Sequence, residues 1–430
     1  MGTAIAQGRV VTARPGYNKG WRVTFAGTGV NLALGVLYAW SVIAGYLRAD
    51  LGWTAMQSQI PYMIACGVFA LLMVPGGRMQ DKIGPRTIIM AAAIFAGIGF
   101  IGSATFLSVA GLAICFGVFF GTAMGLGYSS TTPPAMKWFA PGRRGLVTGL
   151  VVSGFGVAAV YAAPLADFLI GRVGMQQTFL VFGAGAFAFI MLMSQFIANP
   201  PAGYVPPGTG KQPEPEAKKE APRPAPAVDY EWHEMVRTPR FYLLWAMFCF
   251  GSLAGLMVIG QLASIAVDQS GAAMGFMLVA VLAVFNAAGR IGGGILFDRI
   301  GQTRTLLLIF GVQAVNFIFF NTYVNPLALL IGTVVAGTTY GACLSVFPAT
   351  TASLFGVKNL GVNYGLVFTA WGAGGVFGGL TGGLVRDMTG SYLNAYLIAA
   401  ALCLIGIVLT LLLAANGRKR QRALTPAPAA

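Results

Sequence analysis

The sequence predicts an all-α integral membrane protein, with twelve transmembrane helices arranged as two six-helix bundles. Three observations lead there: an apolar composition, a series of long apolar runs, and an internal repeat. Of the 430 residues, 57% are hydrophobic and only 9% are charged, whereas a soluble domain carries about 25% charged residues. This composition excludes a soluble enzyme, a disordered chain and a nucleic-acid-binding protein, so the net charge of +15 is interpreted as a topology signal.

A helix needs about 20 apolar residues to cross a bilayer core of about 30 Å. The sequence contains twelve such runs, at residues 21–47, 54–77, 87–107, 110–136, 145–170, 177–198, 239–267, 273–297, 303–323, 326–355, 363–386 and 391–415. The Pro-, Ala-, Lys- and Glu-rich segment in the middle cannot bury apolar surface, which predicts a flexible cytoplasmic linker. We therefore expect three parts: a six-helix bundle at 1–198, the linker at 199–238, and a second bundle with a short basic tail at 239–430.

Basic residues set the expected orientation. With both termini inside, 23 of the 27 Lys and Arg residues fall in cytoplasmic segments, and only Arg48, Arg172 and Arg386 fall in outer loops. This asymmetry is a strong positive-inside signal. We expect a plasma membrane location (the inner membrane in a bacterium), with both termini cytoplasmic. The five cysteines lie in apolar runs without metal-ligand spacing, so we expect neither a metal site nor a cofactor.

The two halves repeat each other. The loop at residues 77–86 contains Asp81, and a similar loop at residues 294–304 contains Asp298, 217 residues later. Gly145 and Gly149 likewise match glycines 216 residues further on, at 361 and 365. A constant offset over several helices indicates duplication of a six-helix unit. Parallel repeats of this kind build transporters whose site lies between the halves.

One charged residue is expected near the bilayer centre. Arg290 precedes Asp298 by eight residues, which places it about 12 Å from the inner boundary at about 1.5 Å per residue. An arginine at that depth costs about 2.5–3.5 kcal/mol on insertion scales. Asn286 lies one turn earlier, no carboxylate is expected at this depth, and Met73 occupies the equivalent position in the first half. An anionic ligand would compensate this charge, since a guanidinium binds a carboxylate through two parallel hydrogen bonds.

Other polar and aromatic side chains are expected at the same depth. The hydroxyls of Tyr128 and Tyr340 could bind a carboxylate, and Phe368 and Trp371 could pack a short apolar tail. Two further candidates for substrate binding are Ser153 and Asn31. Each of these residues taken alone is more often a packing residue than a ligand contact.

The G-x-x-x-D-x-x-G-x-R pattern at 77–86, with its degenerate copy at 294–304, resembles the major facilitator superfamily. In that family this loop is a cytoplasmic latch between helices. The resemblance therefore implies that Asp81, Arg86, Asp298 and Arg304 are latch residues. The alternative interpretation is that they are ordinary interfacial charges that fix topology.

Three local patterns narrow the resemblance to the oxalate/formate antiporter group and the monocarboxylate transporters. They are Asn286-x-x-x-Arg290, Tyr128 nine residues before Lys137, and the run Ser345-Val346-Phe347-Pro348. The resemblance implies that Arg290 binds substrate carboxylate, with Tyr128 and Tyr340 lining the cavity.

Two departures from these groups bear on substrate and coupling. Oxalate carriers have a lysine where this chain has Trp371, and animal monocarboxylate transporters have an aspartate where it has Asn286. One buried cation balances a monoanion, because an unbalanced second charge is costly to bury. The proton carrier stays open between Asp268, Asp167 and a protonated substrate.

The expected function is secondary active transport of a short, lactate-like monocarboxylate, coupled to protons and working by alternating access. The expected partners are a small carboxylate anion, a proton and the lipid bilayer, with no nucleic acid, and a monomer is the expected functional unit. A carboxylate exchanger of the oxalate/formate antiporter type is the main alternative. A membrane-bound sensor or enzyme is less favoured, since no catalytic cluster is expected within the membrane.

Overall fold

A computed structural model describes residues 19–206, 229–259, 261–270 and 275–424, and every regular element in these ranges is a helix. The predicted fold class is therefore confirmed. The first half contains α1 (Lys19–Leu34), the 3-10 turn η1 (Gly35–Ala39), α2 (Trp40–Leu51), α3 (Ala55–Ile83), α4 (Pro85–Thr105), α5 (Val109–Leu112), the π-helix η2 (Ala113–Phe120), α6 (Gly121–Ser129), α7 (Thr132–Lys137), η3 (Pro141–Arg143) and α8 (Arg144–Ser194). The second half contains α9 (Trp232–Met235), α10 (Pro239–Ile259), α11 (Leu262–Ser270), α12 (Gly275–Ile300), α13 (Gln302–Phe319), η4 (Phe320–Thr322), α14 (Pro326–Phe355), α15 (Leu360–Thr389) and α16 (Leu393–Leu424).

Each predicted span overlaps at least one of these helices, and the spans 21–47, 110–136 and 239–267 each overlap more than one. By length and composition, ten stretches of the described residues could cross a membrane. One of them, Pro141–Ser194, holds two predicted spans, because the helical geometry of α8 breaks at Gly174 (φ 82°, ψ 170°). The predicted span 363–386 is not among the ten, although it lies within α15, a continuous helix of 30 residues. The predicted domain boundaries stay a prediction, since linker residues 207–228 lie outside the described part.

Local sequence signals explain several helix ends. Thr54 caps α3, and its side chain and that of Gln57 form a reciprocal capping box. The sharp turn from α3 to α4 uses Gly84 at φ 94°, and the turn from α12 to α13 uses Gly301 at φ 79°. Glycine suits both turns because a Cβ disfavours positive φ. These two glycines belong to the repeated loops, so the repeat extends to backbone conformation.

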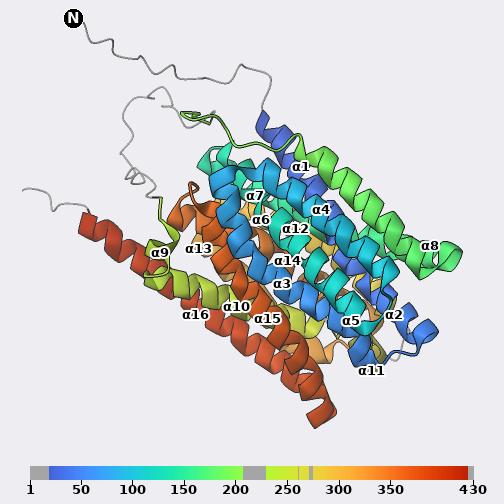
Figure 1. The fold of residues 1–430 in the computed structure, drawn as a ribbon. Coiled ribbons are helices and arrows are strands. Elements are labelled where there is room, and N and C mark those ends of the chain that lie inside the picture. Colours follow the sequence, from blue (N-terminus) through green and yellow to red (C-terminus); the bar gives the residue numbers. More distant parts are fainter. Residues whose placement is uncertain (1–18, 207–228, 260, 271–274, 425–430) are drawn as a thin grey trace, which may run out of the picture.

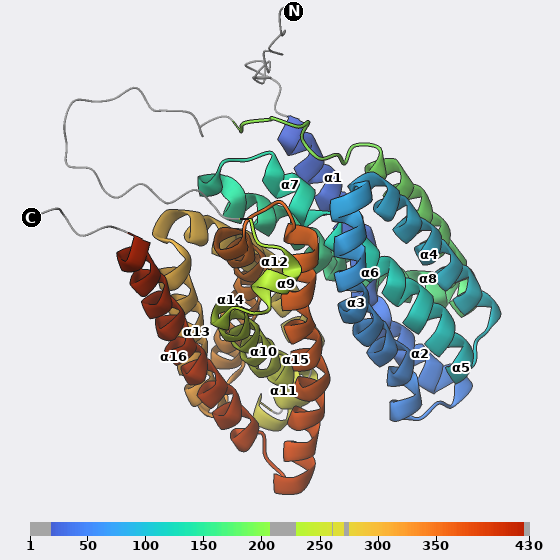
Figure 2. The same cartoon turned by 60° about the vertical axis from the view of Figure 1, so that its left-hand side comes forward.

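The helices form two groups, α1 to α8 and α10 to α16, which lie side by side (Figures 1 and 2). α3 packs on α15, and α8 packs on α12, at the boundary between the groups. α1 begins and α16 ends at the same end of the molecule (Figure 2), which we call the inner end. The opposite end is called the outer end.

Many large apolar side chains are exposed on the outward faces of the helices. They include Phe25, Leu71, Phe377 and Leu327, each more than half exposed. Exposed apolar area on this scale is unusual for a water-soluble monomer. It fits helices that face lipid, as the composition predicts.

Candidate functional site

Arg290 is the charged residue at the centre of the molecule. It lies on α12 and is 1% exposed, which places it among the largest fully buried side chains of the described residues. Its Nε donates to Asn286 Oδ1 at 3.0 Å, and its Nη1 donates to the Val152 carbonyl at 2.6 Å. None of the three ion pairs found in the described residues involves Arg290. Among the described residues, the guanidinium therefore has neutral hydrogen-bond partners and no acidic partner.

Two glycines of α8 allow α12 to come this close. A Cβ on Gly156 would lie 3.2 Å from Arg290 Nε. A Cβ on Gly149 would collide with the Arg290 main-chain carbonyl. Side chains at these positions would push the two halves apart. The short distance from Arg290 to the Val152 carbonyl thus depends on a smooth face of α8.

Aromatic rings from both halves form one packed cluster. The Tyr128 ring centroid lies 5.5 Å from those of Phe69 and Phe368 and 5.7 Å from that of Phe155. Phe368 stacks on Trp371 with centroids 5.0 Å apart. Rings at these separations attract one another beyond simple area burial. These rings form a compact aromatic cluster between the two halves.

Phenolic hydroxyls supply polar groups within this aromatic cluster. Those of Tyr128, Tyr340 and Tyr364 all interact electrostatically with Arg290. The Tyr340 hydroxyl also accepts a 2.8 Å hydrogen bond from Trp371 Nε1. The structure therefore brings together Arg290, Asn286, Tyr128, Tyr340, Phe368 and Trp371 from the predicted set.

Asn31 and Ser153 are engaged elsewhere. Asn31 Nδ2 donates to Thr131 Oγ1 at 3.2 Å and to the Val151 carbonyl at 2.9 Å. Ser153 Oγ donates to the Leu150 carbonyl at 2.8 Å, within its own helix. The hydrogen bonds of Asn31 tie α1 to α8 and to the turn before α7. A substrate-binding role for these two residues stays a prediction.

The sequence analysis missed three residues of the aromatic cluster, Phe69, Phe155 and Tyr364. The repeat contained a signal for two of them. The 217-residue offset relates Asn286 to Phe69, and the 216-residue offset relates Trp371 to Phe155. Applying the offset to every candidate, and not only to Arg290, would have identified them.

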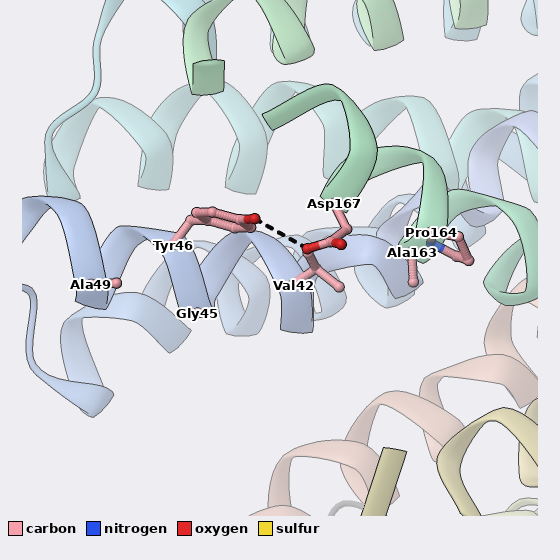
Figure 3. A pocket seen from close by; sticks show the side chains of 7 residues that line it. All are labelled: Val42, Gly45, Tyr46, Ala49, Ala163, Pro164 and Asp167. Carbon is pink, nitrogen blue, oxygen red and sulfur yellow. Dashed lines mark hydrogen bonds between the residues drawn. The ribbon is translucent and has the colours of Figure 1, made fainter. Parts of the chain in front are cut away.

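The two outer acidic candidates have different surroundings. Asp167 accepts a 3.1 Å hydrogen bond from the Tyr46 hydroxyl. Asp167 and Tyr46 line a pocket of 590 Å³ between α2 and α8 (Figure 3), together with Val42, Gly45, Ala49, Ala163 and Pro164. Asp268 instead pairs with Arg386 at 2.7 Å, and both side chains are about a third exposed. Asp167 thus faces an open pocket, whereas Asp268 is held in an ion pair.

At the inner end, each repeated aspartate binds the start of a helix in the other half. Asp81 Oδ2 accepts from the Val362 amide at 3.0 Å, in the first turn of α15. Asp298 accepts from the Gly145 and Leu146 amides at 2.9 and 2.8 Å, in the first turn of α8. A carboxylate at a helix N-terminus satisfies orphan amides and interacts favourably with the helix dipole. These contacts join the halves at the inner end.

Main-chain contacts between glycines complete this closure. Gly77 faces the Gly361 carbonyl, and Gly145 faces the Gly294 carbonyl. A Cβ on Gly77 or Gly145 would collide with the main chain of the facing helix. The pair 77/361 and the pair 294/145 are related by the repeat. The closed inner end is therefore two-fold symmetric down to its backbone contacts.

The basic latch candidates lie differently from the aspartates. The cation that reaches Asp81 is Lys137, at the end of α7, with Nζ 3.6 Å from Oδ1. Arg86 donates to Gln195, near the end of α8 in its own half. Arg304 is exposed. A latch role for Arg86 and Arg304 stays a prediction.

Comparisons with known proteins agree with this architecture. The model of the family described as "Major Facilitator Superfamily" matches residues 23–326 and 270–430. The chain is 28% identical over 382 residues to the oxalate:formate antiporter of Oxalobacter formigenes, covering 87% of this chain and 86% of that protein. It is 23% identical over 349 residues to monocarboxylate transporter 13 of Rattus norvegicus, covering 77% and 74%. The crystal structure of the human organic anion transporter MFSD10 has a TM-score of 0.67 at 13% identity, with 92% of this chain and 100% of that chain covered.

Proposed function

The chain belongs to the Major Facilitator Superfamily and is a multi-pass membrane transporter, not an enzyme, and we propose that it carries short monocarboxylates by proton-coupled symport. A lactate-like anion is the substrate class that we favour. We also propose a bacterial inner membrane location, cytoplasmic termini and a monomeric working unit with the domain boundaries predicted above.

The single observation that carries this proposal is the uncompensated Arg290. A buried charge without an acidic partner is costly. Its hydrogen-bond partners, Asn286 and the Val152 carbonyl, are neutral. A substrate carboxylate would supply the missing negative charge and could accept two parallel hydrogen bonds. The similarity to an oxalate:formate antiporter and to a monocarboxylate transporter supports the same ligand chemistry.

The surroundings of Arg290 favour one negative charge over two. Trp371 and Phe368 stack where a second cation would be needed for a dianion. The hydroxyls of Tyr128 and Tyr340 are neutral donors that orient a carboxylate without adding charge. The aromatic rings would pack the short apolar part of a monocarboxylate. Charge balance is therefore one to one.

The inner contacts support a transport cycle by alternating access. Asp81 and Asp298 hold helix starts of the opposite halves, so release of a substrate to the inside requires both contacts to open. Arg290 would then face the inner side. Of the two acidic proton-carrier candidates, we favour Asp167, since it lines an open pocket while Asp268 is already paired with Arg386.

Exchange of one carboxylate for another is the second candidate. The similarity over 87% of this chain to an oxalate:formate antiporter favours it. In an exchanger, no protein carboxylate need carry a proton, and Asp167 would serve only to hold Tyr46.

Transport by the purified full chain in proteoliposomes tests these alternatives. We expect uptake of lactate to be accelerated by an inwardly directed proton gradient and to be inhibited by monocarboxylates more strongly than by oxalate or other dicarboxylates. Uptake that is independent of the proton gradient but is stimulated by carboxylate inside the proteoliposomes would support exchange and contradict symport. Stronger inhibition by dicarboxylates would overturn the monoanion assignment.

A further inference from the structure

The segment that follows the linker, residues 229–235, lies against the inner end of the second half. Its short helix α9 packs beside α15 (Figure 2). The Tyr230 amide donates to the Phe355 carbonyl at 2.9 Å, and the two rings meet edge to face with centroids 5.6 Å apart. The segment is therefore docked on the turn between α14 and α15.

Asp229 fixes this docking. Its Oδ1 accepts from the Val357 amide at 2.9 Å and from the Lys358 amide at 3.1 Å. The turn positions these amides with Gly356 at φ 83°, where a Cβ would also collide with the Asp229 carboxylate. Nearby, the side-chain amides of Asn359 and Asn363 donate to the Tyr230 carbonyl at 3.2 and 3.1 Å.

The same segment presents negative charge to the first half. Glu231 Oε2 lies 3.9 Å from Arg78 Nη1, at the inner end of α3. Asp229 interacts electrostatically with Lys137 and Arg144, which belong to α7 and α8. Arg78 of the first half thus lies near Glu231 of the docked segment, and Asp229 adds electrostatic attraction for Lys137 and Arg144.

Buried polar groups near the inner end find no protein hydrogen bond. They include both amide atoms of Gln80 and Arg144 Nε. An unpaired buried polar group costs free energy. Attractive contacts between the halves would offset this cost.

We propose that residues 229–235 are an ionic clasp that stabilises the closed inner end. Opening of the halves separates Glu231 from Arg78 and Asp229 from Lys137 and Arg144. The hydrogen bonds to the α14–α15 turn stay intact, because they lie within the second half. The clasp thereby links the linker to the gate. Its role in a transport cycle rests on the proposed function, whereas its effect on conformation does not.

The test measures distances between spin labels across the inner end of the full chain in lipid nanodiscs, without substrate. One label replaces Lys82 on the first half and the other replaces Arg299 on the second, both exposed positions, in a Cys66→Ser background. We expect Glu231→Gln to raise the ratio of long to short distances between about 1.4-fold and 5-fold, the range for a partly exposed ion pair. We expect Arg78→Gln to do the same.

Two further variants make the test decisive. Arg237→Gln removes a charge from an exposed neighbour of the segment, and we expect it to leave the distances unchanged. The exchange Arg78→Glu with Glu231→Arg should restore the original distribution, which a misfolded variant would not do. If Glu231→Gln matches Arg237→Gln, or if the charge exchange fails to restore closure, the clasp is wrong. Since no substrate is present, an error in the proposed substrate would leave this result untouched.

Discussion

The inner end of the molecule preserves the internal repeat, whereas the centre departs from it. At the inner end, Asp81 and Asp298 each accept hydrogen bonds from main-chain amides at the start of a helix in the other half, α15 and α8. At the centre, Arg290 has Met73 as its counterpart, and Asn286 has Phe69. Under the proposed function, the gate uses two related copies of one contact, whereas recognition of a small anion uses one charge.

The largest expected effect is at the centre. Arg290→Lys keeps the charge but loses the planar pair of donors, and charge-assisted hydrogen bonds contribute about 1.5–3 kcal/mol. We expect initial lactate uptake in proteoliposomes to fall by roughly 10- to 150-fold. The equivalent change in the other half, Met73→Leu, should be close to neutral. Uptake by Arg290→Lys at the level of Met73→Leu would mean that the site is misassigned.

A second cation at the centre sharpens the charge argument. Trp371→Lys places an ammonium near Arg290, so a dicarboxylate would gain a partner for its second charge. We expect the ratio of oxalate to lactate binding to rise roughly tenfold, within the range of a charge-assisted hydrogen bond. Trp371→Phe, which removes the hydrogen bond to Tyr340 without adding charge, is the control. Competition against labelled lactate measures both variants, and an unchanged preference in Trp371→Lys would weaken the one-to-one charge balance.

Removing one aspartate at a time tests the symmetry of the inner end. Asp81→Asn and Asp298→Asn should both favour the open inner end, because each weakens charge-assisted contacts to a helix start. We expect roughly a tenfold shift for Asp81→Asn and about threefold for Asp298→Asn, since Asp81 also pairs with Lys137. Labelling of a single inner cysteine by an impermeant maleimide reports the shift. A shift in only one variant would show that closure depends on one of the two contacts and not on both.

The smallest expected effect concerns the outer ion pair. Asp268 and Arg386 are about a third exposed, and such pairs contribute about 0–1 kcal/mol. We therefore expect Asp268→Asn to change uptake less than about fivefold and to keep its dependence on a proton gradient. We expect Asp167→Asn, in contrast, to abolish the dependence of uptake on the proton gradient. If Asp268→Asn loses it and Asp167→Asn keeps it, the proton carriers are assigned the wrong way round.

Much of the fold follows from the sequence, because lipid imposes simple rules on it. Span length, the count of basic residues in loops and the 217-residue offset predicted the helices and the repeat. Helical rise alone predicted a central position for Arg290, and the structure buries its side chain. The hydrogen bond to Val152 did not, because it depends on how α8 and α12 pack, and local sequence does not encode that packing.

The contacts at the inner end show the same limit. The G-x-x-x-D pattern pointed to Asp81, but it did not show that Lys137 is the cation that reaches Asp81. That pairing joins residues of two different helices. Likewise, Asn31 is a polar residue within the predicted span 21–47, but its amide forms a hydrogen bond that joins α1 to α8. The position of a residue along its helix predicts how far it lies from the helix ends. Its hydrogen-bond partner depends on how the helix is rotated against its neighbours.

The backbone contact of Gly77 with Gly361, and of Gly145 with Gly294, has an evolutionary consequence. A contact made of main-chain atoms allows no residue larger than glycine at these positions. It does not depend on which substrate is bound. Side chains in the middle of the membrane can therefore diversify without disturbing closure. A lineage could acquire a new nutrient by changing a handful of central positions and inherit its gate unaltered.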